Sequence, residues 1–238
     1  MNSQSPFANI TPVVKNLLII NILFFIGTYT IGRYIPNIIE FLPAYYFNNP
    51  KFRMWELITY MFMHGGFAHI FFNMFALFSF GPILEYTMGS KKFFNLYFIC
   101  GIGGVICHML VQAYEVHAIT GAFSIANSQT EATYFQYGEQ AQKLYSAYNG
   151  QIVGASGAVF GLLIAFGMLF PNMELMIMFI PVPIKAKYII PVYVVVELFL
   201  GVKQYSGDSV AHFAHLGGAL IGYIMVKVWR LQRPNNFY

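Results

Sequence analysis

The sequence has few charged residues, and this scarcity excludes most soluble folds. Only 9% of the 238 residues are Asp, Glu, Lys or Arg, whereas 58% are hydrophobic. A soluble domain carries about 25% charged residues. The composition therefore indicates a protein with several membrane-spanning segments. The net charge of +4 is small and no run of Lys or Arg occurs, so we expect no nucleic-acid partner.

Cysteine is also scarce, and the two cysteines are poorly placed for a disulfide. Cys100 and Cys107 lie seven positions apart in one apolar run. In a helix this separation puts their Cα atoms roughly 10 Å apart, beyond the ~7 Å limit for a disulfide. We expect both side chains to serve in apolar packing.

The sequence lacks the features of a cleavable signal peptide. The polar N-terminal stretch is short, and the first apolar run has no A-x-A cleavage site. We therefore expect that run to be kept as a membrane span. The short N-terminus without a targeting extension predicts a multi-pass protein of the inner (cytoplasmic) membrane of a bacterium.

Long apolar runs make up most of the sequence. About 20 apolar residues cross the ~30 Å hydrocarbon core of a bilayer. Six segments reach or approach that length, namely residues 17–31, 57–84, 93–113, 152–170, 188–202 and 210–231. They predict an all-α bundle of six transmembrane helices in a single membrane domain spanning residues 1–238. Residues 114–150 are polar and are expected to form a long extramembrane loop between helices three and four, part of which, residues 130–148, could form a helix above the membrane.

The basic residues of the connections predict the orientation of the bundle. If the N-terminus is inside, the inner side carries eight Lys and Arg: Lys15, Lys91, Lys92, Lys185, Lys187, Lys227, Arg230 and Arg233. The outer side then carries five: Arg33, Lys51, Arg53, Lys143 and Lys203. Because basic residues favour the cytoplasmic side, both termini are predicted to be cytoplasmic.

Polar side chains within the predicted helices gather at one depth. They come from the stretches MHGGFAHIFFN, GASG and AHFAHLGG of helices two, four and six: His64, His69, Asn73, Ser156, His212 and His215. In the predicted topology all three helices run from outside to inside, and these residues fall in the outer half of each. Polar groups inside a membrane are costly and commonly mark function.

Small residues predict that helices four and six touch. The stretches GAVFG (157–161) and GALIG (218–222) have the G-x-x-x-G form that allows close helix packing. This packing would bring Ser156 into contact with His215. A serine hydroxyl is a weak nucleophile until a base takes its proton, and neutral histidine is the usual base. We predict Ser156 as the nucleophile and His215 as the general base.

Donors for a developing oxyanion are available on the second helix. His69 and Asn73 are four positions apart and share a helix face. Their side-chain N–H groups, with the backbone N–H of Ser156, could form an oxyanion hole. No acidic residue lies near these positions in the sequence, so a Ser–His dyad is predicted. Glu197 is expected to bond a neighbouring helix.

Other interpretations of the same residues stay open at this point. Ser and Asn in membrane helices often serve only in helix packing, and His212 competes with His215 as the base. His64, His69, His212 and His215 could instead bind Zn²⁺. No H-E-x-x-H motif occurs and no carboxylate joins them in the sequence, so we expect neither a metal nor a cofactor.

The motifs HGGFAHIFFN, GASG and AHLGG, in this order, make the sequence similar to the rhomboid intramembrane serine proteases over most of its length. The resemblance implies a six-helix bundle in the lipid bilayer, with a water-filled cavity open to the outside. It implies transmembrane protein substrates cut within or near the membrane. It assigns Ser156 and His215 to catalysis, and His69 and Asn73 to the oxyanion. A catalytically inactive relative that binds membrane clients is the alternative.

Two positions depart from the pattern of that family. Members often have Trp-Arg in the first outer loop, where this sequence has Trp55-Glu56. They often have a tyrosine one turn after the serine, where this sequence has Phe160. Phe160 can stack on the predicted base but cannot donate a hydrogen bond.

Overall fold

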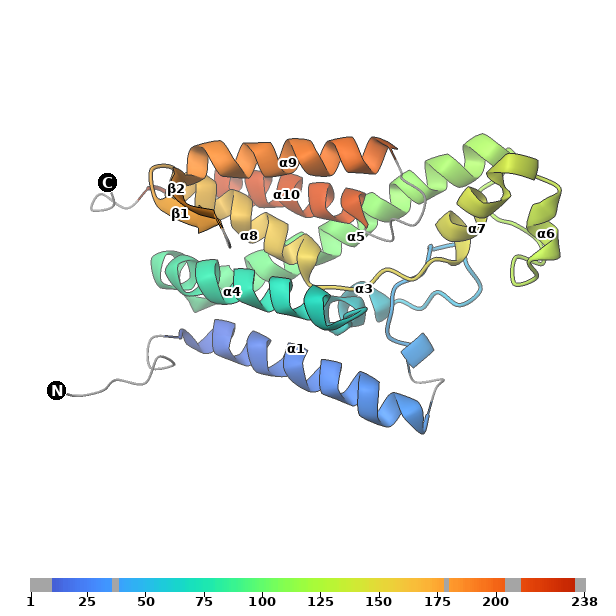
Figure 1. Cartoon of the computed structure of the whole chain (residues 1–238), viewed down its shortest axis with the longest axis horizontal. Helices are drawn as coiled ribbons and strands as arrows, with labels where there is room; N and C mark the ends of the chain where they lie inside the picture. Colours follow the sequence, from blue (N-terminus) through green and yellow to red (C-terminus); the bar gives the residue numbers. More distant parts are fainter. Residues whose placement is uncertain (1–9, 36–38, 178–179, 204–210, 234–238) are drawn as a thin grey trace.

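The computed structural model describes residues 10–35, 39–177, 180–203 and 211–233. Within these residues, six helices of 14 residues or more lie alongside one another (Figure 1): α1 (Pro12–Thr30), α4 (Phe67–Met88), α5 (Ser90–Thr120), α8 (Ser156–Leu169), α9 (Ala186–Lys203) and α10 (His212–Val228). The prediction of a mostly helical fold is confirmed. In Figure 1, α1 begins and α10 ends at the same end of the bundle.

The helices differ in how well their length suits a bilayer. Among the described residues, three are long and apolar enough to cross a membrane: Pro12–Arg33, Phe67–Met88 and Ser90–Thr120. α8 and α10 are apolar but shorter. α9 has 18 residues and contains Lys187, Glu197 and Lys203. Large hydrophobic side chains cover the outer faces, among them exposed Leu23, Phe72, Leu110, Val195 and Leu220, and such faces suit contact with lipid.

The second predicted span begins later than the sequence indicated. We predicted one segment over residues 57–84, but residues 56–62 form two short helices, α3 (Glu56–Thr59) and η3 (Tyr60–Phe62). Met63 and Gly66 are extended, and α4 starts at Phe67. The pair Gly65-Gly66 interrupts the helix because glycine is a poor helix former. This interruption places His69 in the first turn of α4.

Residues 114–150, predicted as a long loop that could contain a helix, form short helices and are here called the cap. α5 continues to Thr120, and α6 (Ala132–Phe135), η4 (Gly138–Gln140) and α7 (Ala141–Asn149) follow. Their buried side chains form a separate hydrophobic cluster: Tyr46, Ala113, Val116, Ile125, Tyr134, Leu144, Ala147 and Tyr148. The Asn49 side chain donates to the Tyr148 carbonyl at 2.7 Å, and the Tyr148 hydroxyl donates to the Asn48 carbonyl at 2.8 Å. The connection after α1 is therefore fastened to the cap.

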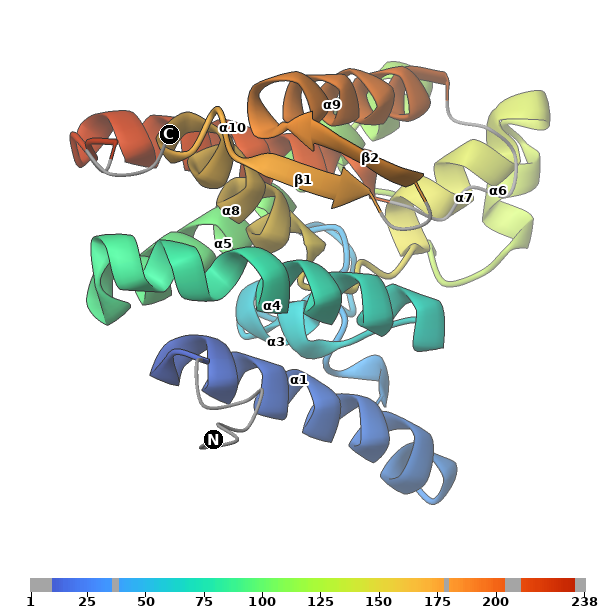
Figure 2. The ribbon, with the colours of Figure 1, turned by 60° about the vertical axis from the view of Figure 1, so that its left-hand side comes forward.

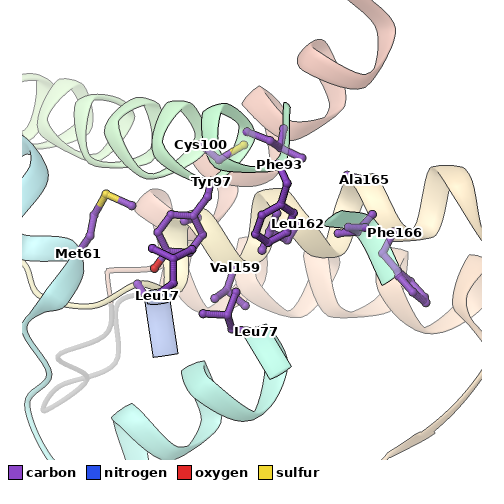
Figure 3. Packing of buried hydrophobic residues seen from close by; sticks show 14 of the residues in the cluster. Leu17, Met61, Leu77, Phe93, Tyr97, Cys100, Val159, Leu162, Ala165 and Phe166 are labelled. Atoms are coloured by element: carbon purple, nitrogen blue, oxygen red, sulfur yellow. The ribbon is translucent and has the colours of Figure 1, made fainter. Parts of the chain in front are cut away.

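The main hydrophobic core lies between α1, α4, α5 and α8 (Figure 3). Figure 3 shows Leu17, Leu77, Phe93, Tyr97 and Phe166 converging with their neighbours in this core. Cys100 is buried in the same cluster, and both cysteines are free thiols. The prediction that they do not form a disulfide is confirmed.

Glycines bring α5, α8 and α10 into backbone contact at the centre of the bundle. A Cβ atom at Gly218 of α10 would overlap the carbonyl oxygen of Gly157 in α8. One at Gly222 would lie 2.5 Å from the carbonyl oxygen of Gly161, and one at Gly104 of α5 would lie 2.6 Å from that of Ala214. The predicted close packing of GAVFG on GALIG is thus present.

α1 and α9 lie on opposite sides of this centre (Figures 1 and 2). The start of α1 is held on α4 by Glu85, whose carboxylate accepts the backbone N–H groups of Val13 and Val14 at 3.1 and 3.0 Å. The hydroxyl of Ser90 donates to the same carboxylate at 2.6 Å. Between α8 and α9, β1 (Glu174–Ile177) and β2 (Ile180–Lys185) form an antiparallel hairpin (Figure 2).

Candidate active site

Ser156 is the first residue of α8, and the segment before it is fixed by backbone hydrogen bonds. Ala44 and Ile152 form a two-way bridge, and the Gly154 N–H donates to the Tyr60 carbonyl at 2.9 Å. Gly154 has φ +122°, a conformation that side chains rarely adopt. Because Ser156 begins a helix, its backbone N–H has no partner within that helix.

His215 contacts Ser156 directly. Its Nε2 atom lies 2.6 Å from the Ser156 Oγ atom, and its side chain is buried. His215 lies in the first turn of α10, where the glycine contacts hold α10 against α8. The predicted pair is therefore brought together, and the packing of two helices on glycine backbones is what brings it together.

Glu197 of α9 joins this pair from a third helix. Its Oε2 atom lies 2.9 Å from Nδ1 of His215 and 2.6 Å from Nδ1 of His212. An ionised carboxylate can only accept hydrogen bonds, so each Nδ1 atom carries the proton. The neutral His215 ring then presents the lone pair of Nε2 to the Ser156 hydroxyl. This is the tautomer that a general base requires.

An aromatic stack fixes the plane of the His215 ring. Phe160 lies parallel to the ring, with centroids 4.5 Å apart and an interplanar angle of 8°. Tyr193 of α9 stacks on Phe160 in turn, at 5.4 Å and 4°. Phe160 thus supplies the contact expected of the tyrosine that it replaces, without a hydroxyl.

His69 lies on the other side of Ser156. The Gly65 N–H donates to its Nδ1 atom at 3.4 Å, so the neutral ring carries its proton on Nε2. That Nε2 atom lies next to Gly154, where a Cβ atom would be only 2.6 Å away. The same Cβ position is 3.6 Å from the Ser156 Oγ atom. His69 can therefore direct an N–H group to the space beside the serine.

Asn73 lies one turn after His69 on the same face of α4. Its side-chain Nδ2 atom donates to the His69 carbonyl at 3.0 Å, and the residue is buried. An amide carries two hydrogens, so one remains for another acceptor. Beside His69, the ring of His64 makes an edge-on contact at a centroid distance of 5.0 Å.

The histidines form two separate pairs and not one four-histidine cluster. His64 contacts His69, whereas His212 and His215 share Glu197. Within the described residues, Glu197, His212 and His215 are the group that could hold a metal ion, with donor atoms all within 4.8 Å of one another. A metal on Nδ1 of His215 would leave the proton of the neutral ring on Nε2, so a metal there is incompatible with His215 acting as a base.

Glu197 is the residue that reasoning from sequence missed. We expected no carboxylate at the site, and assigned Glu197 only to helix contact. It lies 18 positions before His215, on a different helix, and no spacing rule connects them. The available signal was chemical: a single carboxylate in the apolar stretch VVVELFLG requires a buried partner.

Helices that bring a half-buried serine to a buried histidine and a buried carboxylate define a helical membrane protein with the side chains of a serine hydrolase. The sequence profile of the Rhomboid domain matches residues 51–231. The chain therefore belongs to the rhomboid family.

Several curated rhomboid proteins are similar to this chain. An uncharacterised mitochondrial rhomboid protein of Schizosaccharomyces pombe is 26% identical over 214 residues, which cover 77% of this chain and 54% of that protein. The mitochondrial Rhomboid protein 1 of Saccharomyces cerevisiae is 28% identical, covering 71% and 40%. The rhomboid protease GluP of Bacillus subtilis is 37% identical over 68 residues, covering 29% and 13%. The chain spans about half or less of the length of these relatives.

The predicted bacterial cytoplasmic membrane is wrong. The relatives in the two yeasts are mitochondrial proteins, which contradicts the bacterial assignment. The prediction rested on the short polar stretch before the first apolar run. That stretch describes the start of this sequence and carries no information about the compartment.

Proposed function

We propose that this chain is an intramembrane serine endopeptidase that cleaves transmembrane protein substrates. Most members of the rhomboid family are intramembrane serine proteases, and these act on transmembrane substrates within the bilayer. The observation that carries the proposal is the 2.6 Å contact between Ser156 Oγ and His215 Nε2. A serine at the start of one helix meets the correct nitrogen of a histidine on another.

In the proposed reaction, the Ser156 oxygen attacks the carbonyl carbon of the scissile peptide bond. The hydroxyl proton passes to Nε2 of His215, and the carbonyl π electrons move to the oxygen. His69 Nε2–H, the second amide hydrogen of Asn73 and the Ser156 backbone N–H stabilise the oxyanion. His215 then gives its proton to the leaving amine, and water hydrolyses the acyl-enzyme.

A cavity beside the oxyanion donors supports access of water. It has a volume of about 450 Å³, and Met63, His64, Gly65 and Val153 are among its lining residues. Both ring nitrogens of His64 are buried and lack a hydrogen-bond partner among the described residues. Buried polar atoms beside a roomy cavity are commonly satisfied by water. Water held there would lie beside His64, whose ring contacts that of His69.

We further propose that all six long helices traverse the bilayer, with both termini on one side. The 14 residues of α8 extend for roughly 21 Å at 1.5 Å per residue, less than the ~30 Å hydrocarbon core. If α8 ends at the opposite surface, it starts below the surface on the side of the cap, and Ser156 would then lie within the bilayer. The excess of Lys and Arg at the opposite ends of the helices supports this orientation.

The proposal is tested by proteolysis in liposomes. Purified protein is reconstituted with a single-span substrate that has small residues at the cut, and the products are identified by mass spectrometry. Cleavage is expected for the wild type and is lost in Ser156→Ala and His215→Ala. Ser146→Ala on α7 and His117→Ala at the end of α5 are matched controls that keep activity. Cleavage that survives Ser156→Ala contradicts the proposal.

A further inference from the structure

We propose that Glu197 is a positioning residue of the active site, so that the site works as a Ser–His–Glu triad assembled from α8, α10 and α9. This inference rests on the proposed protease function. It adds a third helix to the two that carry the dyad. It also gives His212 the task of holding the carboxylate in place.

Four side chains form one continuous series of hydrogen bonds: Ser156, His215, Glu197 and His212. Ser156 Oγ is 2.6 Å from His215 Nε2, and His215 Nδ1 is 2.9 Å from Glu197 Oε2. The same oxygen is 2.6 Å from Nδ1 of His212. Glu197, His212 and His215 are each less than 10% exposed. Bulk water therefore does not compete for these hydrogen bonds.

The carboxylate selects the tautomer of His215. An imidazole without a partner on Nδ1 can carry its proton on either nitrogen, and only the form with a free Nε2 accepts the serine proton. Glu197 accepts the Nδ1–H bond and so favours the active form. Phe160 fixes the plane of the ring but cannot distinguish the two nitrogens.

The carboxylate also stabilises the charge that forms during the reaction. When the Ser156 Oγ–C bond forms, the hydroxyl proton moves to Nε2 and His215 becomes an imidazolium. The Nδ1 proton stays on His215, and Glu197 stays ionised, so the two form a buried ion pair. Such a pair is stronger in a low-dielectric interior than in water. The proton later leaves with the amine, and Glu197 neither gains nor loses one.

His212 accounts for the position of the carboxylate itself. Its Nδ1–H group and that of His215 approach the same oxygen from the first turn of α10. Two donors on one helix fix the Glu197 side chain more firmly than one. Both histidines turn Nδ1 to Glu197, but it is Nε2 of His215 that contacts Ser156, so His215 is the base in this arrangement and His212 supports the carboxylate.

The test replaces each of two buried glutamates, Glu197 and Glu85, by glutamine. Glu197→Gln keeps the shape of the side chain, but its amide can donate to Nδ1 and favour the wrong tautomer. We expect kcat to fall about 10²–10⁴-fold with KM little changed, as for the loss of a triad carboxylate. Glu85→Gln is the matched control, since Glu85 binds backbone N–H groups and a serine at the far end of α4. It is expected to keep wild-type kcat.

Two further variants separate positioning from simple packing. Glu197→Asp keeps the carboxylate on a shorter side chain and is expected to give a kcat between those of Glu197→Gln and the wild type. His212→Ala is expected to lower kcat about ten-fold, because one of two donors to the carboxylate is lost. All assays contain EDTA, so that no metal ion occupies the three donor groups.

A spectroscopic measurement reports on the same claim without any substrate. In ¹⁵N-histidine spectra at high pH, the His215 signals, assigned by their loss in His215→Ala, are expected to show the proton on Nδ1 in the wild type. In Glu197→Gln the proton is expected to move largely to Nε2. A wild-type ring protonated on Nε2 overturns the inference, whether or not the protein is a protease.

The kinetic outcomes keep the two proposals apart. If Ser156→Ala and His215→Ala abolish cleavage while Glu197→Gln cleaves at the wild-type rate, the site is a dyad and the triad is wrong. If the wild type cleaves nothing but shows the Nδ1 tautomer, the protease proposal fails and the Glu197–His215 contact stands.

Discussion

The helix bundle buries Glu85 toward one end and Glu197 toward the other, and these two glutamates differ in what binds them. At one end Glu85 accepts hydrogen bonds from Val13, Val14 and Ser90. At the other end Glu197 accepts hydrogen bonds from His212 and His215. Backbone amides and a hydroxyl do not titrate near neutral pH, whereas imidazoles do.

The donors that bind each glutamate indicate which of the two takes part in the active site. The donors of Glu85 are fixed, so its carboxylate can only hold α1 against α4. The donors of Glu197 are imidazole rings, and one of them contacts a serine at 2.6 Å through its other nitrogen. A buried carboxylate thus acquires a function from its partners and not from its burial alone.

The largest expected loss of activity at the site end follows from Gly154→Ala. The added Cβ atom would lie 2.6 Å from His69 Nε2, at a backbone φ of +122°. Displacing an oxyanion donor together with the segment before Ser156 should lower kcat/KM by about 10³-fold or more. Cleavage kinetics and a thermal melt measure the two effects. Near-wild-type activity would contradict the assignment of His69 as an oxyanion donor.

The next largest effect is expected from Gly218→Ala, which separates α8 from α10. The new methyl group would overlap the Gly157 carbonyl oxygen, so the helices must move apart. We expect about 10²-fold lower kcat and roughly 1–3 kcal/mol lower stability. Gly27→Ala in α1 is the control, because nothing lies within 4 Å of its added Cβ. Equal behaviour of the two variants would show that the close packing is unimportant.

At the opposite end, Glu85→Ala should change stability alone. Three hydrogen bonds to a carboxylate are lost, which predicts a loss of roughly 2–4 kcal/mol in the free energy of unfolding. kcat measured well below the melting temperature should stay at the wild-type value. Denaturant titration and cleavage kinetics check the two expectations, and a large fall in kcat would remove the contrast between the two ends.

The smallest effect is expected at Phe160. Phe160→Leu removes the parallel stack on His215 and should lower kcat about ten-fold, since an aromatic stack contributes about 0.5–1.5 kcal/mol. Phe160→Tyr keeps the stack and should stay within about three-fold of the wild type. Steady-state kinetics of the pair check this, and a ten-fold gain in Phe160→Tyr would mean that a hydroxyl is missing from the site.

The local parts of the fold and site could be predicted from the sequence. The apolar runs predicted helices that overlap α1, α5, α8, α9 and α10. The glycine pairs of α8 and α10 predicted the contact that joins Ser156 and His215. Each of these features depends on spacing within one helix or on composition, and both are visible in a linear sequence.

Features that depend on tertiary contact could not be predicted. Glu197 contacts His215 only because α9 packs beside α10, and no residue near Glu197 in the sequence indicates that packing. The break before α4 was missed because residues 57–63 continue the apolar run, although Gly65-Gly66 marks the break in the sequence. The cap folds on its own hydrophobic cluster, which joins Tyr46 to residues about 100 positions away. A helix within residues 130–148 could be predicted, but the cluster on which it packs could not.

The most direct test of the central claim, that His215 makes Ser156 a nucleophile, is the site of reaction with a fluorophosphonate. Purified protein is labelled with the probe in the presence of EDTA, and the modified residue is identified by peptide mass spectrometry. The account predicts one adduct, on Ser156, that is absent in Ser156→Ala and forms about 10³-fold or more slowly in His215→Ala. Labelling of Ser156→Ala at the wild-type rate, or a wild-type adduct on another residue, would contradict it.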